Sequence, residues 1–194
     1  MRKFLAILLL LCLPCLLFAK ELGTVGISFG PSLSYYSIEE TKVFSNELSV
    51  KLCGSNPMVK DWEVRYAIGF NFPSISLVNG SNVGLSNRLT DLTLEGGFSY
   101  RLPLSKKISL SFGPGLSFFM GTRPLSKTER VYQYALNLEG TFSTLFKINP
   151  MFGINLDLKL YTPLWLYTTG SNVSRHSCFN GFYLMGLIGF IYNY

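Results

Sequence analysis

The side chains that could act as a nucleophile and a base lie together near position 176. His176 is the only histidine in the chain, and Ser177 and Cys178 follow it. A serine or cysteine beside a histidine can carry out nucleophilic hydrolysis when an acidic group orients the imidazole. No Asp or Glu follows His176 in the sequence. We therefore expect His176 to be a solvated loop residue and the protein to be non-enzymatic.

The cysteines and glycines form no pattern typical of a metal or cofactor site. Cys12 and Cys15 lie in an apolar leader, which leaves Cys53 and Cys178. The strand pattern places these two at opposite ends of the molecule, too far apart for a disulfide. The sequence also has no glycine-rich phosphate loop. We expect no disulfide between them, no metal and no cofactor.

Residues 1–19 have the layout of a secretory signal peptide. Arg2 and Lys3 precede an apolar run that ends at the small residue Ala19. The alternatives are a membrane-anchoring helix, for which the run is short, and a lipoprotein acylated on a leader cysteine. We expect cleavage after residue 19 and one exported domain over residues 20–194. Charged residues make up only 14% of the chain, which argues against a disordered protein or a nucleic-acid partner.

Apolar residues alternate with small polar ones along most of the chain after residue 20. Val25 and Ile27, for example, alternate with Gly26 and Ser28. A period of two is typical of β-strands whose two faces meet different environments. Seven segments show it clearly, and an eighth, weaker one fits residues 42–53. The seven are 22–35, 61–72, 89–102, 107–120, 130–146, 151–162 and 181–194.

The connections favour eight strands over seven. With eight, all compact turns lie at one end of the molecule, the turn end, and all longer loops lie at the other, the loop end. The compact turns are 54–57, 103–106 and 147–150, and the longer loops are 74–88, 121–129 and 164–180. Internal repeats agree, since Ile27–Ser34 matches Leu110–Ser117 in a strand of the same direction. Short turns and an even strand count are typical of bacterial outer-membrane barrels.

Aromatic residues favour lipid as the environment of the apolar side. They gather at the strand ends, as in the two interfacial belts of membrane barrels. The turn-end belt comprises Trp62, Tyr100, Phe146, Phe152, Tyr192 and Tyr194, and the loop-end belt comprises Tyr35, Phe72, Phe118, Tyr132, Tyr134 and Phe182. The polar side, rich in Ser, Gly, Asn and Thr, suits a crowded interior. Gly189, Tyr192 and Tyr194 form a candidate C-terminal insertion signal.

On these features the chain resembles the small eight-stranded outer-membrane barrels of the OmpA-transmembrane, OmpX and OmpW type. The resemblance covers residues 20–194 and implies residence in the outer membrane, assembly by the barrel-insertion machinery and no shared catalytic residues. The expected fold is all-β, an eight-stranded antiparallel up-and-down transmembrane β-barrel preceded by a signal peptide. The expected role is structural, surface-binding or small-solute passage, carried out by a monomer in the lipid bilayer.

Two other functions stay open at this point. One is a soluble secreted or periplasmic lipocalin-like barrel that binds an apolar ligand inside. The other is an outer-membrane lipid-modifying enzyme, which would depend on His176. The direction in which the apolar rows point decides between a soluble barrel and a membrane barrel, because a soluble barrel has its apolar rows inside.

Charged residues on the polar side must pair inside so narrow a barrel. Folding the strands about their connections places some of these charges next to one another. The predicted neighbours in the lumen are Arg65 with Glu95 or Gly97, Glu139 with Lys159 or Asp157, and Asp61 with Arg101. Of these, Arg65 with Glu95 and Glu139 with Lys159 are the predicted ion pairs. The alternative to such a filled lumen is a gated pore.

The longer loops are the expected contact surface. Arg123 and Lys127, with Arg130 adjacent, are expected to meet lipopolysaccharide, another outer-leaflet lipid or a host polyanion. Trp165 and Tyr167 are candidates for an interface anchor or an adhesive tip.

Overall fold

The computed structural model describes residues 23–38, 40–83, 91–124, 130–170, 174–177 and 180–194. The predicted signal peptide and its cleavage site lie outside these residues. Within them, no helix is long and apolar enough to cross a membrane. All regular structure is β-strand. The eight long strands are β1 (Thr24–Ile38), β2 (Thr41–Val59), β3 (Trp62–Val78), β5 (Asp91–Pro103), β6 (Ile108–Pro124), β7 (Arg130–Lys147), β8 (Phe152–Thr169) and β10 (Gly181–Asn193).

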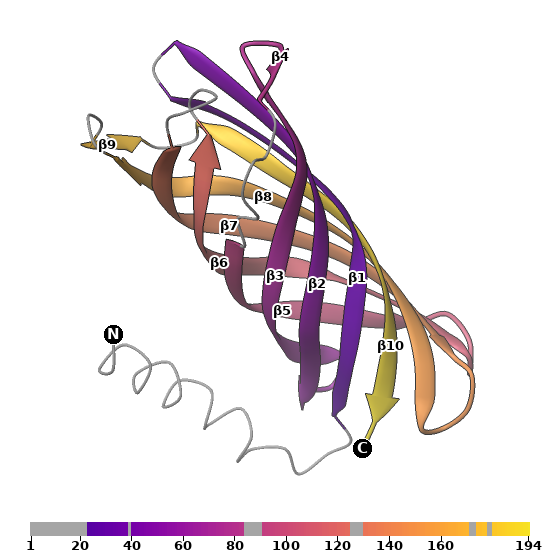
Figure 1. The fold of residues 1–194 in the computed structure, drawn as a ribbon. Helices are drawn as coiled ribbons and strands as arrows, with labels where there is room; N and C mark the ends of the chain where they lie inside the picture. Colours follow the sequence, from indigo (N-terminus) through magenta and orange to yellow (C-terminus); the bar gives the residue numbers. More distant parts are fainter. Residues whose placement is uncertain (1–22, 39, 84–90, 125–129, 171–173, 178–179) are drawn as a thin grey trace, which may run out of the picture.

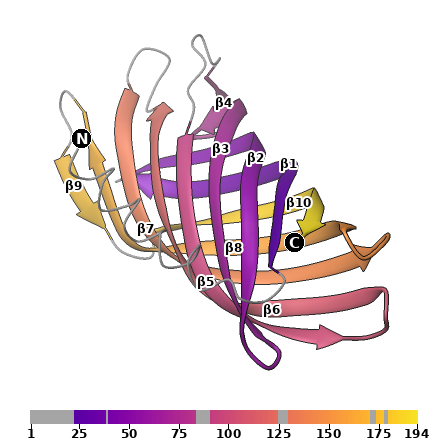
Figure 2. The same ribbon diagram turned by 90° about the horizontal axis from the view of Figure 1, so that it is seen from below.

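The long strands close into an antiparallel barrel (Figures 1 and 2). Each pairs with its neighbour along the chain, and β10 pairs with both β8 and β1. The closing pairs run from Thr24 opposite Asn193 to Tyr36 opposite Gly181. Two short strands extend hairpins at the loop end: β4 (Ser81–Asn82) pairs with β3, and β9 (Ser174–Ser177) pairs with β8. The eight-stranded up-and-down barrel predicted from the alternation is thus confirmed.

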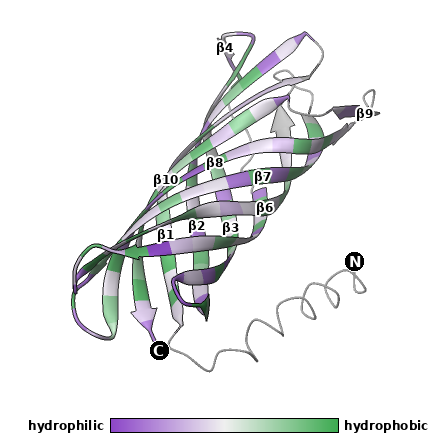
Figure 3. Cartoon of the chain, turned by 180° about the vertical axis from the view of Figure 1, so that it is seen from behind, coloured by the Kyte–Doolittle hydropathy of each residue, from purple (hydrophilic) through white to green (hydrophobic). Residues whose placement is uncertain are grey.

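The two faces of the wall have the polarity of a membrane barrel. Apolar side chains point outward and stay accessible, with Leu52 and Phe190 each 57% exposed. Their polar neighbours point inward, and Ser28, Ser49 and Asn71 are fully buried. Figure 3 shows the hydropathy of the strands alternating along the wall. This arrangement contradicts the alternative of a soluble barrel, whose apolar rows would converge on the interior.

β-Bulges in β3 and in β8 make these two strands longer than the alternation indicated. In β3 the ladder to β2 skips Ser74, and in β8 the ladder to β7 skips Leu164. Each extra residue reverses which of two successive side chains points inward. Tyr161 is buried before the second bulge, whereas Leu166 is buried after it. The predicted strands at 61–72 and 151–162 stop at these bulges, and β3 and β8 continue to Val78 and Thr169.

Some predicted connections are also displaced. The segment 54–57 is wrong as a turn, because β2 continues to Val59 and the chain reverses at Lys60, which has a φ of 50°. Residues 74–88 contain the end of β3 and a tight hairpin at Asn79-Gly80, where both φ values are positive. An Asn-Gly pair is favoured in such two-residue hairpins because both residues tolerate this conformation. The predicted loop 164–180 contains the end of β8 and all of β9.

Candidate functional site: the barrel lumen

The loop-end half of the lumen is filled by buried side chains, and the apolar ones among them form two clusters. Inward side chains from several strands meet there without solvent. They are Tyr36, Val43, Val78, Val83 and Val131 in one cluster, and Phe119, Ala135 and Leu166 in another. None of these side chains is more than 8% exposed. Packed apolar side chains leave no room for a column of water, so in the part of the chain that the structure describes these clusters block this half of the lumen.

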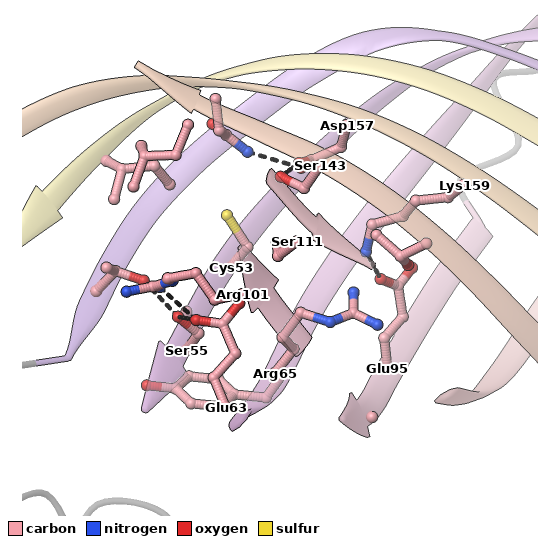
Figure 4. Close-up of a pocket in the computed structure, with 18 of the residues that line it drawn as sticks. Cys53, Ser55, Glu63, Arg65, Glu95, Arg101, Ser111, Ser143, Asp157 and Lys159 are labelled. Carbon is pink, nitrogen blue, oxygen red and sulfur yellow. Dashed lines mark hydrogen bonds and ion pairs between the residues drawn. The ribbon is translucent and has the colours of Figure 1, made fainter. Parts of the chain in front are cut away.

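The turn-end half of the lumen holds a polar cavity of about 80 Å³. Its walls come from strands on all sides of the barrel, as Figure 4 shows. The functional groups that line it include Cys53, Glu63, Arg65, Arg101, Asp157 and Lys159. The volume is small beside the roughly 300–1,000 Å³ of pockets for drug-sized ligands. It suits water or a small ion.

Glu95 is the centre of the buried charges. Lys159 Nζ lies 2.5 Å from Glu95 Oε2, and Lys51 forms an ion pair with Glu95 Oε1. The Tyr161 hydroxyl donates to Glu95 Oε1 over 2.8 Å and accepts from Lys51 Nζ over 2.8 Å. Lys51 and Glu95 are at most 3% exposed, and Lys159 is 7% exposed. These groups join β2, β5 and β8 across the lumen.

Glu139 forms a second centre beside the first. Lys159 Nζ lies 3.4 Å from Glu139 Oε1, so the structure brings together the predicted neighbours Glu139 and Lys159. The Thr141 hydroxyl donates to the same oxygen over 2.5 Å. The predicted pairing of Arg65 with Glu95 is wrong, because Arg65 Nη1 lies 3.5 Å from Glu139 Oε1. The carboxylate of Glu95 forms its ion pairs with Lys51 and Lys159 instead.

A third group of charges lies nearer the turn end. The Arg101 guanidinium forms an ion pair with Glu63, which also accepts from Ser99 Oγ over 2.8 Å. The predicted contact of Arg101 with Asp61 is only a backbone hydrogen bond, from Arg101 N to Asp61 O over 2.6 Å. The Asp61 carboxylate accepts instead from the Tyr100 hydroxyl over 3.5 Å. Asp61 is therefore not a lumen charge.

Sequence reasoning missed the roles of Lys51 and Tyr161. Neither residue is among the lumen neighbours that the sequence predicts. One signal was available, because Tyr161 continues the inward phase of Asp157 and Lys159 along β8.

The aromatic residues at the turn end lie where the sequence placed them. Trp62 on β3 packs edge-on against Tyr100 on β5, with ring centroids 5.7 Å apart. Phe152 on β8 contacts Tyr192 on β10 at 5.4 Å. The Tyr194 hydroxyl donates to Asn56 Oδ1 over 3.0 Å. These rings lie at the same ends of adjacent strands.

The loop-end aromatics lie at the opposite ends of the strands. Tyr35 on β1 contacts Phe182 on β10, with centroids 5.8 Å apart. Tyr132 is 60% exposed on β7, and Phe118 is partly exposed on β6. Gly189 of the candidate insertion signal faces the lumen, where a Cβ atom would collide with Asn155 and Ser28. A close approach of side chains inside the barrel thus requires glycine at this position.

The residues assigned to outer loops have mixed positions. Trp165 and Tyr167 belong to β8, and His176 belongs to β9, so their assignment to a loop is wrong. The His176 ring stacks on Tyr167 at 4.7 Å, and the Trp165 ring lies 6.1 Å from that of Tyr167. The backbone of Arg123 pairs with Val131 between β6 and β7. Lys127 and Cys178 lie outside the described residues.

The described part of the chain offers no obvious reactive centre. No group of three or more His, Cys, Asp or Glu side chains there could hold a metal ion. His176 and its neighbours lie on β9 at the loop end, whereas the polar cavity lies in the turn-end half of the lumen. The charged side chains in the lumen form ion pairs that connect strands on different sides of the barrel.

Comparison with solved structures finds the same architecture at low sequence identity. Neisserial surface protein A is similar with a TM-score of 0.59 and 11% identity, over 89% of this chain and 97% of that one. Ail, the attachment invasion locus protein of Yersinia pestis, has a TM-score of 0.49 and 15% identity, over 89% and 99%. No protein-family model and no curated protein matches the sequence. With its outward apolar rows and its likeness to Neisserial surface protein A, the chain has the fold of the small outer-membrane β-barrels.

Proposed function

We propose that the protein is a non-enzymatic, monomeric integral protein of the bacterial outer membrane with a structural and surface-binding role. The outward apolar rows require acyl chains around the barrel, because in water they would form an exposed apolar surface far larger than soluble monomers show. The turn end faces the periplasm and the loop end faces the exterior, as in barrels with short turns on one side.

The closed lumen is the observation that favours this role over solute passage. The two apolar clusters at the loop end exclude water, and the ion pairs around Glu95 and Glu139 cross the middle of the barrel. A solute would have to separate charges that are almost completely buried. The surface left for function is the loop end, and the sequence that connects β6 and β7 carries Arg123 and Lys127, which we expect to bind lipopolysaccharide or another polyanion.

Three measurements test this proposal. The barrel refolded in lipid vesicles should migrate faster on a gel before boiling than after it. The protein made in bacterial cells should fractionate with the outer membranes. In a planar bilayer it should show no stepwise conductance. Steady channel openings would contradict the closed lumen, and a chain that stays folded in water without detergent would contradict membrane residence.

A further inference from the structure

Two hairpin turns form one surface at the turn end. The turn between β5 and β6 and the turn between β7 and β8 are joined by a backbone hydrogen bond from Lys147 N to Lys107 O of 2.7 Å. The second turn is also bonded to the end of β10, from Asn193 N to Met151 O over 2.8 Å. Figure 1 shows both turns beside one another at the lower right of the barrel.

This surface combines lysines with apolar side chains. Lys106, Lys107 and Lys147 are exposed. Leu104, Ile148 and Met151 are exposed by 57%, 60% and 50%. We call these six residues the turn-end patch. Neither residues 103–108 nor residues 146–152 contain an Asp or Glu. The patch is therefore positively charged and apolar at once.

The patch lies immediately beyond the aromatic belt. Lys147 follows Phe146, and Met151 precedes Phe152, so the patch is directly adjacent in the chain to two outward aromatic residues. One strand residue spans about 3.3 Å, which places the lysine backbone at the depth of the lipid headgroups. Lysine stems can lie along apolar surface at this depth while their ammonium groups reach phosphate. Leu104, Ile148 and Met151 are exposed in the same two turns, so a lipid bound by these lysines would contact them as well.

We propose that the turn-end patch binds an anionic phospholipid of the leaflet at the turn end, through its phosphodiester headgroup and its acyl chains. The inference rests on the proposed membrane function and adds the class of lipid. An acidic protein would neutralise the lysines but would leave the three apolar tips without a partner, whereas a phospholipid satisfies both. The hairpin between β2 and β3 differs, because Lys60 there is adjacent to Asp61.

Spin-labelled lipids measure this preference directly. The refolded barrel is placed in phosphatidylcholine bilayers with spin-labelled phosphatidylglycerol or spin-labelled phosphatidylcholine. At low salt the phosphatidylglycerol label should associate about threefold more strongly, as expected for a few lysines near a lipid surface. The triple variant Lys106→Gln/Lys107→Gln/Lys147→Gln should reduce this ratio to near one. The triple variant to Arg at the same positions should keep it, and so should Lys60→Gln.

The outcomes separate this inference from the proposed function. A wild-type barrel that inserts but shows equal association overturns the inference alone and leaves an acidic periplasmic protein as the occupant. Retention of the preference by the triple glutamine variant also overturns it. A chain that never gains the faster gel migration in any bilayer overturns the membrane assignment and this inference together.

Discussion

At the scale of residues, the interior depends on carboxylates that are shared. Glu95 serves two lysines and one tyrosine, and Glu139 serves Arg65, Lys159 and Thr141. Each carboxylate neutralises more than one buried donor, so its loss leaves several groups without a partner at the same time. Removing one member of a buried ion pair lowers the free energy of unfolding more than replacing both members by apolar residues, because the remaining charge stays desolvated.

Glu95→Gln is expected to lower the free energy of unfolding by about 3–5 kcal/mol, because Lys51 and Lys159 would then face each other without their common anion. Urea unfolding in lipid vesicles measures the change. Asp61→Asn is the matched control and should cost less than about 1 kcal/mol, because Asp61 is exposed and its carboxylate accepts a hydrogen bond of 3.5 Å from Tyr100. Adding Lys51→Met to Glu95→Gln should restore part of the loss. An unfolding midpoint equal to that of the wild type would contradict the central role of Glu95.

At the scale of elements, the alternation predicted the strands and their faces but not the bulges. A single extra residue in β3 and in β8 changes the phase, so a period-two pattern ends at Ser74 and Leu164 although the strand continues. The residue pairs of the lumen were predictable only in part. Folding about turns identifies cross-strand neighbours, and Arg65 is indeed opposite Gly97. The side chain nevertheless reaches across the lumen to β7, a contact that depends on the barrel's closure and tilt.

Deletion of Leu164 should preserve the barrel, because it removes the bulge and leaves Trp165 opposite Leu136 and Pro163 opposite Asn137. We expect a loss of about 1 kcal/mol or less, with gel migration before boiling unchanged. Deletion of Leu158 is the control, since it shifts Lys159 toward lipid and Leu160 toward the lumen. That chain should not reach the fast-migrating form. Equal behaviour of the two deletions would show that β8 does not have this register.

At the scale of the whole molecule, the lumen is open to small species only in its turn-end half. Cys53 lines the polar cavity there, with Sγ 3.4 Å from the Ser28 hydroxyl. The apolar clusters separate this thiol from the loop end. The end of the barrel from which a thiol reagent reaches Cys53 therefore shows which end is open and which is closed.

In a Cys178→Ser background, a small membrane-impermeant thiol reagent should leave Cys53 unmodified in intact cells and modify it after osmotic shock opens the periplasm. A polyethylene-glycol maleimide should fail in both cases, since the cavity holds only about 80 Å³. Mass spectrometry measures the adduct, and the additional substitution Cys53→Ser removes it. Modification of intact cells at an equal rate would show that the loop end is open.

The alternation of side chains has a consequence for the chain before it folds. Nearly every apolar residue after residue 22 has a small or polar neighbour. The extended polypeptide therefore lacks the long apolar segment that would insert as a transmembrane helix into the first bilayer that the chain crosses. Lateral pairing of the strands is what sorts the two kinds of side chain onto separate surfaces. The affinity for lipid is thus a property of the assembled wall, and it vanishes when the strands come apart.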